Sequence, residues 1–105
     1  MSDPTPSTNA IQHIAAAGLN AHGAFIVLGR DGIRTAEMLY AQRGDHIVID
    51  HTWVDDSLRS QGFARKLLDA LVAWARETGT LVRVTCKYAK VQFEKDPSIQ
   101  DVLAD

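Results

Sequence analysis

Cysteine is nearly absent from this chain, whose 105 residues include only Cys86. A lone thiol can neither close an intramolecular disulfide nor supply a cysteine-based zinc cluster. The histidines have no cysteine or carboxylate at the spacing of a convincing metal site, so we expect no metal. The composition therefore predicts a protein that folds by packing alone, in a reducing and cytoplasmic setting.

Long apolar runs and an excess of basic charge are also missing. No run approaches the roughly 20 apolar residues that span a bilayer, and residues 1–10 lack the charged start and apolar centre of a signal peptide. Eleven Lys and Arg against thirteen Asp and Glu give a formal net charge of −2, without the basic surface typical of nucleic-acid modules. We therefore expect no export and neither membrane nor nucleic acid as a partner.

The first nine residues differ in composition from the rest. They hold two of the three prolines and almost nothing to bury, which predicts a disordered tail over residues 1–9. A chain of this length has room for one compact domain, and we expect residues 10–105 to form it.

Three segments before residue 55 have the pattern of strands. Apolar residues 24–28 are followed by an Asp-Gly turn and a returning strand over residues 35–42. Residues 46–54 alternate, which would place Ile47, Ile49, His51 and Trp53 on one face. The sequence predicts a three-stranded antiparallel meander.

The pattern then changes to that of a helix and a further strand. Residues 61–77 carry apolar side chains at helical spacing, Gly79 is a helix stop, and residues 81–86 alternate as a strand. A strand–helix–strand unit is a right-handed crossover, so the strands over 46–54 and 81–86 should be parallel. With a short helix over residues 88–95, stopped by Pro97, the expected fold class is α/β of the α+β kind.

The junction between strand and helix has the chemistry of an anion site. A helix N-terminus presents N–H groups and the positive end of the helix dipole. Gly62 in the first turn would let a phosphate approach the main chain, and Arg59, Arg65 and Lys66 add positive charge. The alternative is a surface loop in which Gly62 only relieves crowding; neither GxxxxGK[ST] nor GxGxxG is present.

A family resemblance begins at this loop. The stretch Arg59-Ser60-Gln61-Gly62-Phe63-Ala64 matches the R/Q-x-x-G-x-G/A signature of the GNAT superfamily of acetyl-CoA-dependent N-acetyltransferases. His51-Thr52-x-Val54 and Cys86-x-Tyr88-Ala89-Lys90 resemble its small YjdJ-type subgroup, and the resemblance runs over about residues 24–103. Ser60 replaces a frequent second glycine, and Lys87 a frequent proline. The resemblance implies a minimal GNAT fold, shortened at its C-terminus, that transfers acetyl from acetyl-CoA to a small-molecule or peptide amine.

The resemblance also implies a CoA site. The pyrophosphate would bind the N–H groups of residues 59–64, and main chain around Trp53 and Val54 would contact the thioester oxygen. Tyr88 could protonate the thiolate or only pack, and Lys90 could meet a phosphate or solvent. The expected cofactor-binding residues are Trp53, Val54, Arg59, Ser60, Gln61, Gly62, Phe63, Ala64, Arg65, Lys66, Tyr88 and Lys90.

Cys86 and His51 are the candidate catalytic residues, because ligands of a parallel unit lie beyond the carboxyl ends of its strands. Cys86 could be a nucleophile, the acid for the CoA sulfur, or a small buried residue. His51 could be a base or a hydrogen-bonded core residue. Glu37 could orient the amine or be a solvated carboxylate. We expect direct attack by the amine, because passing acetyl to a cysteine exchanges one thioester for another.

A second function stays open at this point. A chain this short reduces the usual substrate-binding elements, so it could bind CoA with little or no turnover. We expect a monomer or a weak homo-oligomer, and the sequence does not identify the acceptor.

Overall fold

The computed structural model describes residues 11–104, so the predicted tail over residues 1–9 lies outside the described residues. One sheet contains, in spatial order, β1 (Ile11–Ile14), β2 (His22–Leu28), β3 (Arg34–Gln42), β4 (His46–Val54) and β5 (Leu81–Val84). The first four strands are antiparallel and β5 is parallel to β4. The predicted α+β topology is confirmed, and β1 is an additional strand that the sequence analysis missed.

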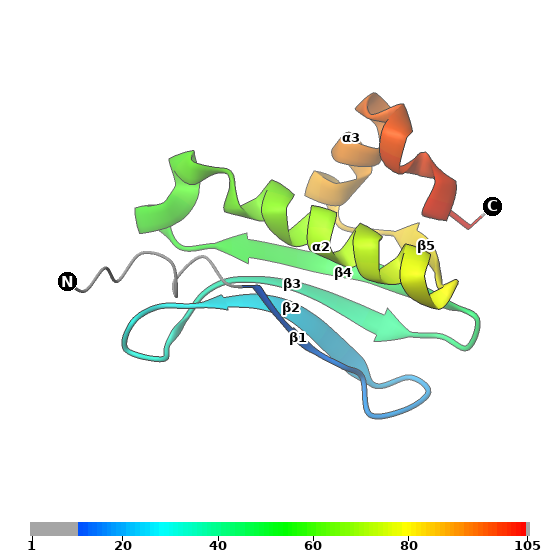
Figure 1. Ribbon diagram of the computed structural model, residues 1–105, viewed down its shortest axis with the longest axis horizontal. Helices are drawn as coiled ribbons and strands as arrows, with labels where there is room; N and C mark the ends of the chain where they lie inside the picture. The colour runs from blue at the N-terminus through cyan, green and yellow to red at the C-terminus, as the bar shows by residue number, and fades with distance from the viewer. Residues whose placement is uncertain (1–10, 105) are drawn as a thin grey trace.

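Two helices lie on the same side of the sheet (Figure 1). A 3-10 helix, η1 (Asp56–Gln61), leads into α2 (Phe63–Thr78), which connects β4 to β5. After β5 come α3 (Lys87–Lys95) and a second 3-10 helix, η2 (Pro97–Val102). The predicted stop of α2 at Gly79 is confirmed, with φ of 70° and an N–H bond to the carbonyl of Ala75. Within residues 11–104, no helix combines the length and apolar character needed to cross a membrane.

The apolar side of α2 and the facing side of the sheet form the core. Each buried leucine stabilises the fold by roughly 1.5–3 kcal/mol. Because α2 buries several of them, it is the main cover of the sheet. α3 adds Ala89 and Phe93 to the core. The buried residues of α2 are Phe63, Leu67, Leu68, Leu71, Val72 and Ala75.

A β-bulge interrupts β4 at its middle. Leu39 of β3 pairs with His51, whereas the next residue, Tyr40, pairs with Ile49. Asp50 is therefore an extra residue on β4, and it shifts the alternation of side chains by one position.

The bulge overturns the predicted common face of β4. Ile47 is fully buried toward α2, but His51 and Trp53 are exposed on the other face of the sheet. Thr52 and Val54 take the inward positions instead and are partly buried. Of the two alternatives for His51, the core position was therefore wrong.

Beyond the bulge, β4 and β5 separate. Their parallel pairing ends at Ile49 with Val84, and the Ile49 carbonyl accepts N–H groups from both Thr85 and Cys86, at 2.9 and 3.1 Å. β5 thus ends two residues earlier than predicted. Residues 51–54 of β4 pair with β3, and within residues 11–104 no strand pairs with their other edge.

The outer edge of β5 is partly covered by the end of the chain. Leu103 forms a parallel bridge with Val82, and the N–H of Ala104 donates to the Val82 carbonyl at 2.8 Å. The carbonyl of Val82 is therefore satisfied on this side.

An aromatic cluster of His13, Phe25, Tyr40 and Trp74 closes the opposite side of the helix-covered face. The rings of His13 and Phe25 stack with centroids 4.1 Å apart, and Trp74 of α2 packs edge-on against both. The Tyr40 hydroxyl lies 2.7 Å from His13 Nε2 and accepts the N–H of Ala16 at 3.4 Å. Burial lowers the pKa of His13 and raises that of Tyr40.

Candidate functional site

A groove of about 400 Å³ lies where β4 separates from β5, at the N-terminal end of α2. Eight of its nine lining residues are predicted cofactor-binding residues, so the structure brings most of that set together. The ninth is Thr52, which sequence reasoning missed although it lies within the stretch that resembles the GNAT subgroup. The lining residues of this β4–α2 groove are Thr52, Trp53, Val54, Arg59, Gly62, Phe63, Ala64, Arg65 and Tyr88.

The first turn of α2 presents main-chain N–H groups to this groove. No side chain caps the helix, and its first turn holds no acidic residue. The N–H of Lys66 donates to the Gly62 carbonyl at 3.1 Å, so the N–H groups of residues 63–65 precede the helical ladder. Residues 62–65 all line the groove. An anion here would meet these donors and the positive end of the helix dipole.

Gly62 has a left-handed backbone with φ of 75°, which non-glycine residues adopt at a cost of about 1–2 kcal/mol. A Cβ at this position would meet no protein atom within 4 Å. Relief of crowding therefore does not account for Gly62. Its backbone conformation requires glycine, and open space adjoins it.

The free edge of β4 also faces the groove with main-chain groups. The N–H of Asp55 donates to the Thr35 carbonyl of β3 at 2.8 Å. Because N–H groups alternate in direction along a strand, those of Thr52 and Val54 point away from β3. Arg59 Nε donates to the Val54 carbonyl at 3.3 Å, which agrees with this direction. The strand thus offers N–H donors beside the helix N-terminus.

The other predicted residues of the loop lie around the groove or outside its lining. Arg59 pairs with Asp56 at 3.0 Å, and its side chain is 66% exposed. The ammonium group of Lys66 lies 4.6 Å from the centroid of the Phe63 ring. Ser60 and Gln61 belong to η1, are exposed, and are not among the lining residues.

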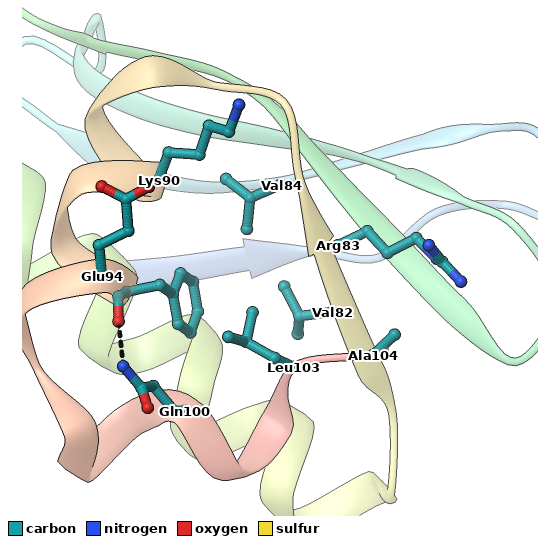
Figure 2. A pocket seen from close by; sticks show the side chains of 9 residues that line it. Val82, Arg83, Val84, Lys90, Glu94, Gln100, Leu103 and Ala104 are labelled. Atoms are coloured by element: carbon teal, nitrogen blue, oxygen red, sulfur yellow. Dashed lines mark hydrogen bonds between the residues drawn. The ribbon is translucent and has the colours of Figure 1, made fainter.

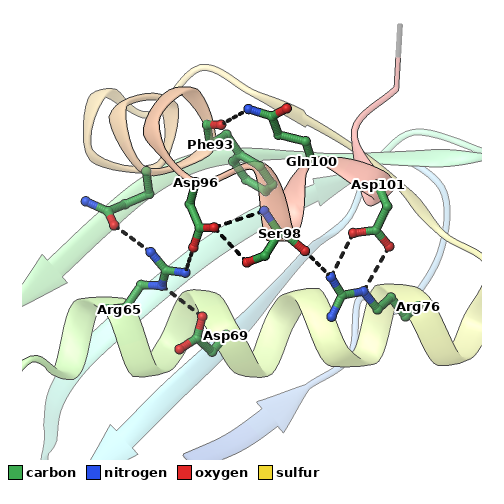
Figure 3. A network of polar contacts seen from close by, with 9 residues as sticks. Arg65, Asp69, Arg76, Phe93, Asp96, Ser98, Gln100 and Asp101 are labelled. Carbon is green, nitrogen blue, oxygen red and sulfur yellow. Dashed lines mark hydrogen bonds and ion pairs between the residues drawn. The ribbon is translucent and has the colours of Figure 1, made fainter.

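Arg65 connects the groove to the C-terminal part of the fold (Figure 3). Its guanidinium contacts Asp69 at 2.8 Å, Gln92 at 2.9 Å, and the carboxylate of Asp96. The carboxylates of Asp96 and Asp69 raise the pKa of Arg65. The hydroxyl and N–H of Ser98, together with Arg65, lower the pKa of Asp96 to about 2. Arg65 thereby fixes α3 against the first turns of α2.

A second arginine of α2 reinforces this link. Arg76 donates to both carboxylate oxygens of Asp101, at 2.9 and 2.7 Å, and to the carbonyl of Ser98 at 2.6 Å (Figure 3). The two arginines hold α3 and η2 over the helix, which keeps the start of α3 beside the groove.

Cys86 lies just after β5, at the N-cap position of α3. Its sulfur is 3.1 Å from Thr52 Oγ1, across the gap between the separated strands. Tyr88, in the first turn of α3, lines the groove, and burial raises the pKa of its hydroxyl. The Thr52 hydroxyl and the Tyr88 phenol therefore both belong to residues that line the groove, and the Cys86 thiol contacts the first of them.

His51 lies on the opposite face of β4, so the structure does not bring it to Cys86. His51 Nε2 is 3.2 Å from Glu37 Oε2, and the imidazole is 46% exposed. Glu37, the register partner of Trp53, also pairs with Arg34 at 3.0 Å and is 21% exposed. The predicted solvated carboxylate is thus a partly buried residue with two cationic or potentially cationic partners.

Lys90 faces a different cavity of about 380 Å³ between β5, α3 and the end of the chain (Figure 2). Val82, Val84 and Phe93 give this cavity an apolar wall, with Lys90 and Glu94 at its side. Lys90 is therefore not one of the residues that line the β4–α2 groove. Residues 11–104 contain no group of three or more His, Cys, Asp or Glu side chains arranged to hold a metal ion.

Comparison with known proteins decides the family. Residues 24–102 match the family of GCN5-related N-acetyl-transferases. The chain belongs to this family. Among proteins with curated descriptions, no match was found.

Two solved structures resemble this GCN5-related N-acetyltransferase chain. One is a GCN5-like candidate N-acetyltransferase from Staphylococcus aureus, with 35% sequence identity and a TM-score of 0.70 over 93% of this chain and 90% of that one. The other is an acetyltransferase from Bacillus cereus, with 21% identity and a TM-score of 0.53 over 76% of this chain and 51% of that one. The second likeness concerns the fold alone. The family supports acetyl transfer as the general activity.

Proposed function

We propose that this protein transfers acetyl from acetyl-CoA to an amine, by direct attack of the amine on the thioester. One observation carries the proposal: the β4–α2 groove joins the uncapped N-terminus of α2 to the free edge of β4. The first supplies donors for phosphate oxygens, and the second supplies donors for a carbonyl oxygen.

In this proposal, residues 63–65 bind the CoA pyrophosphate through their main-chain N–H groups. The N–H groups of Thr52 and Val54 stabilise the thioester oxygen as negative charge develops on it. Such a donor, fixed in place before the reaction, is worth about 3–4 kcal/mol of barrier in enzymes of acyl transfer. No side chain is needed for that task.

One side chain that lines the groove suits the departure of the thiolate. Burial raises the pKa of Tyr88, so its hydroxyl holds a proton at neutral pH that it can donate to sulfur. Cys86 contacts the Thr52 hydroxyl, and His51 lies on the other side of β4. Because a cysteine nucleophile is usually activated by an adjacent base, this arrangement favours direct transfer over an acetyl-cysteine intermediate.

A pair of glycine variants tests the cofactor site. Gly62→Ala and Gly44→Ala both place alanine at positive φ, 75° and 81°, with no protein atom within 4 Å of the new Cβ. Gly44 lies in the turn between β3 and β4, outside the groove. We expect similar losses of stability, but a more than tenfold loss of CoA affinity, above about 1.4 kcal/mol, in Gly62→Ala alone. Equal CoA affinity of both variants in calorimetry contradicts the assignment.

Turnover separates the proposal from a CoA-binding module. CoA release is measured with acetyl-CoA and a panel of a lysine peptide, a peptide with a free N-terminus, and a polyamine. Binding of CoA without release on any amine supports the binding module. Intact mass spectrometry with acetyl-CoA alone checks the mechanism, because an acetyl adduct on Cys86 that an amine discharges contradicts direct attack. A cytoplasmic location and a monomeric or weakly oligomeric state stay predictions.

A further inference from the structure

One side of α3 faces the first turns of α2. Tyr88, Gln92 and Asp96 follow one another at four-residue intervals, from the first turn of α3 to its C-cap, so they lie along the same side of this helix. Arg65 of α2 donates to Gln92 at 2.9 Å and contacts the carboxylate of Asp96 (Figure 3). Arg65 and Tyr88 both line the β4–α2 groove. The side of α3 that Arg65 holds is therefore the side that brings Tyr88 to the groove.

The contact of Arg65 with Asp96 restrains α3 most, because both partners are charged. Asp96 Oδ1 accepts the N–H and the hydroxyl of Ser98, at 3.0 and 2.6 Å, which leaves Oδ2 for Arg65. The side chains of Arg65 and Asp96 are 32% and 25% exposed, against 47% and 56% for Arg76 and Asp101, so solvent screens the first pair less. A helix of nine residues is marginal by itself. Its contacts with α2 and the core therefore decide where its first turn lies.

Opposing influences act on the Tyr88 hydroxyl. Burial raises its pKa, the charge of Arg65 lowers it, and the charges of Asp69 and Cys86 raise it again. Since Asp69 and Asp96 both pair with Arg65, they offset the pull of its charge on the proton of the phenol. The residues of β4 that line the groove carry no titratable side chain. The charged or titratable groups around this hydroxyl and its helix are Arg59, Arg65, Asp69, Cys86 and Asp96.

We infer that Asp96, acting through Arg65, positions the Tyr88 hydroxyl to protonate the departing CoA thiolate. This inference rests on the proposed function. As the amine nitrogen bonds to the acetyl carbonyl carbon, the carbon–sulfur bond breaks with its electron pair on sulfur, and the Tyr88 hydroxyl gives its proton to that sulfur. The nitrogen releases its proton to water, and the phenolate regains one from water, so the proton count balances. Tyr88 is then the catalytic residue, and Arg65 and Asp96 are positioning residues.

Two matched asparagine variants test the inference on the full chain. Asp96→Asn and Asp101→Asn each remove a carboxylate from an arginine of α2, but only Asp96 shares a side of α3 with Tyr88. We expect Asp96→Asn to lower kcat by about tenfold without weakening the binding of acetyl-CoA, because the lost contact matters only for the step at sulfur. Asp101→Asn loosens η2, which carries no residue of the groove, and should keep the wild-type kcat.

A double variant separates positioning of Tyr88 from a general loosening of the fold. We expect Tyr88→Phe to lower kcat by about 10²-fold, within the usual range for loss of a general acid. Adding Asp96→Asn to it should cause no further loss, because Asp96 acts through Tyr88. Wild-type kcat in Asp96→Asn, or losses that multiply in the double variant, overturns the inference. If Asp96→Asn fails to fold, Ser98→Ala removes the hydroxyl that orients the same carboxylate and should also lower kcat.

Titration of the phenol separates failure of this inference from failure of the proposed function. Carbon-13 NMR reports the pKa of Tyr88 in the free protein and resolves it from Tyr40, the other tyrosine of the chain. Asp96→Asn removes a negative charge beside Arg65, so we expect it to lower the pKa of Tyr88, whereas Asp101→Asn should leave that pKa unchanged. If the wild type acetylates no amine, the proposed function fails, while the titration still decides whether Asp96 acts on Tyr88. An unchanged pKa of Tyr88 in Asp96→Asn overturns the inference whatever the activity.

Discussion

The two sides of the helix-covered face are held together by different forces. On one side, the aromatic cluster of His13, Phe25, Tyr40 and Trp74 seals β1–β3 under α2 by ring packing. On the other, β4 and β5 diverge, and the start of α3 is held beside the gap by Arg65. The first side lacks the β4–α2 groove, and the second contains it.

This difference suggests a division between stability and binding. Ring packing depends little on salt, whereas ion pairs of partly exposed groups weaken as salt screens them. The sealed side can therefore hold the sheet rigid while the open side stays accessible to a ligand. Substitutions on the two sides should separate these properties, and the following predictions are arranged from the largest expected effect to the smallest.

Truncation of Tyr40 should damage the sealed side most. Its side chain is 1% exposed and lies at the centre of the cluster. We expect Tyr40→Ala to lower the free energy of unfolding by about 3–5 kcal/mol in urea titrations. Tyr40→Phe keeps the ring and should cost about 1 kcal/mol, the usual worth of a hydrogen bond. A comparable fall in CoA affinity of the folded Tyr40→Phe protein would contradict the division.

Removal of the Thr52 hydroxyl should change the reactivity of Cys86 more than it changes the stability of the fold. We expect Thr52→Val to cost about 1 kcal/mol of stability. A thiolate at Cys86 can only accept a hydrogen bond, so loss of the Thr52 hydroxyl should slow alkylation of the thiol by about tenfold. The rate with iodoacetamide, measured against Thr80→Val as a distant control, checks this. An unchanged rate shows that the hydroxyl does not assist the thiolate.

Acid should weaken the ion pair of Arg65 with Asp96, which holds α3 against α2. The pKa of Asp96 is about 2 in the folded chain because Ser98 and Arg65 stabilise its charged form, against an ordinary value of 3.8. Its contribution to stability is present above about pH 4 and is lost as the pH falls toward 2. We expect Asp96→Asn to remove this part of the pH dependence in urea titrations. Parallel curves for the variant and the wild type would show that the pair contributes nothing.

The aromatic side should lose stability at a milder pH than the Asp96 pair does, and the loss should be smaller. Burial lowers the pKa of His13 from its ordinary 6.5, so below that pH the unfolded chain binds more protons than the folded one. Stability therefore falls as the pH drops below about 6.5. We expect His13→Gln to flatten this slope, with His22→Gln as a control for losing an exposed imidazole. The same slope in His13→Gln and the wild type argues against the assignment.

Much of the topology could be predicted because local chemistry fixes it. The Asp-Gly turn, the helical spacing before Gly79 and the short crossover leave few alternative arrangements. β1 was missed because four residues with two polar positions give too short a pattern, and its position depends on contacts of His13 with distant rings.

The site was only partly predictable for a similar reason. The motif around Gly62 lies at the strand-to-helix junction as expected, because its backbone and the helix start are local features. The bulge at Asp50 is not local, since it appears only when β4 is aligned with β3. It moves His51 and Trp53 to the exposed face, and it brings Thr52 to Cys86. The pairing of His51 with Glu37 follows from the same register.

The bridge between Leu103 and Val82 also has a consequence for how copies of this chain behave in solution. An edge strand with unpaired main chain is a template for pairing with another molecule and thus for aggregation. The bridge, and the hydrogen bond from Ala104 to Val82, occupy part of the outer edge of β5 with residues of the same chain. A variant that ends before Leu103 would leave this part of the β5 edge unpaired. Its tendency to self-associate should therefore change before its ligand binding does.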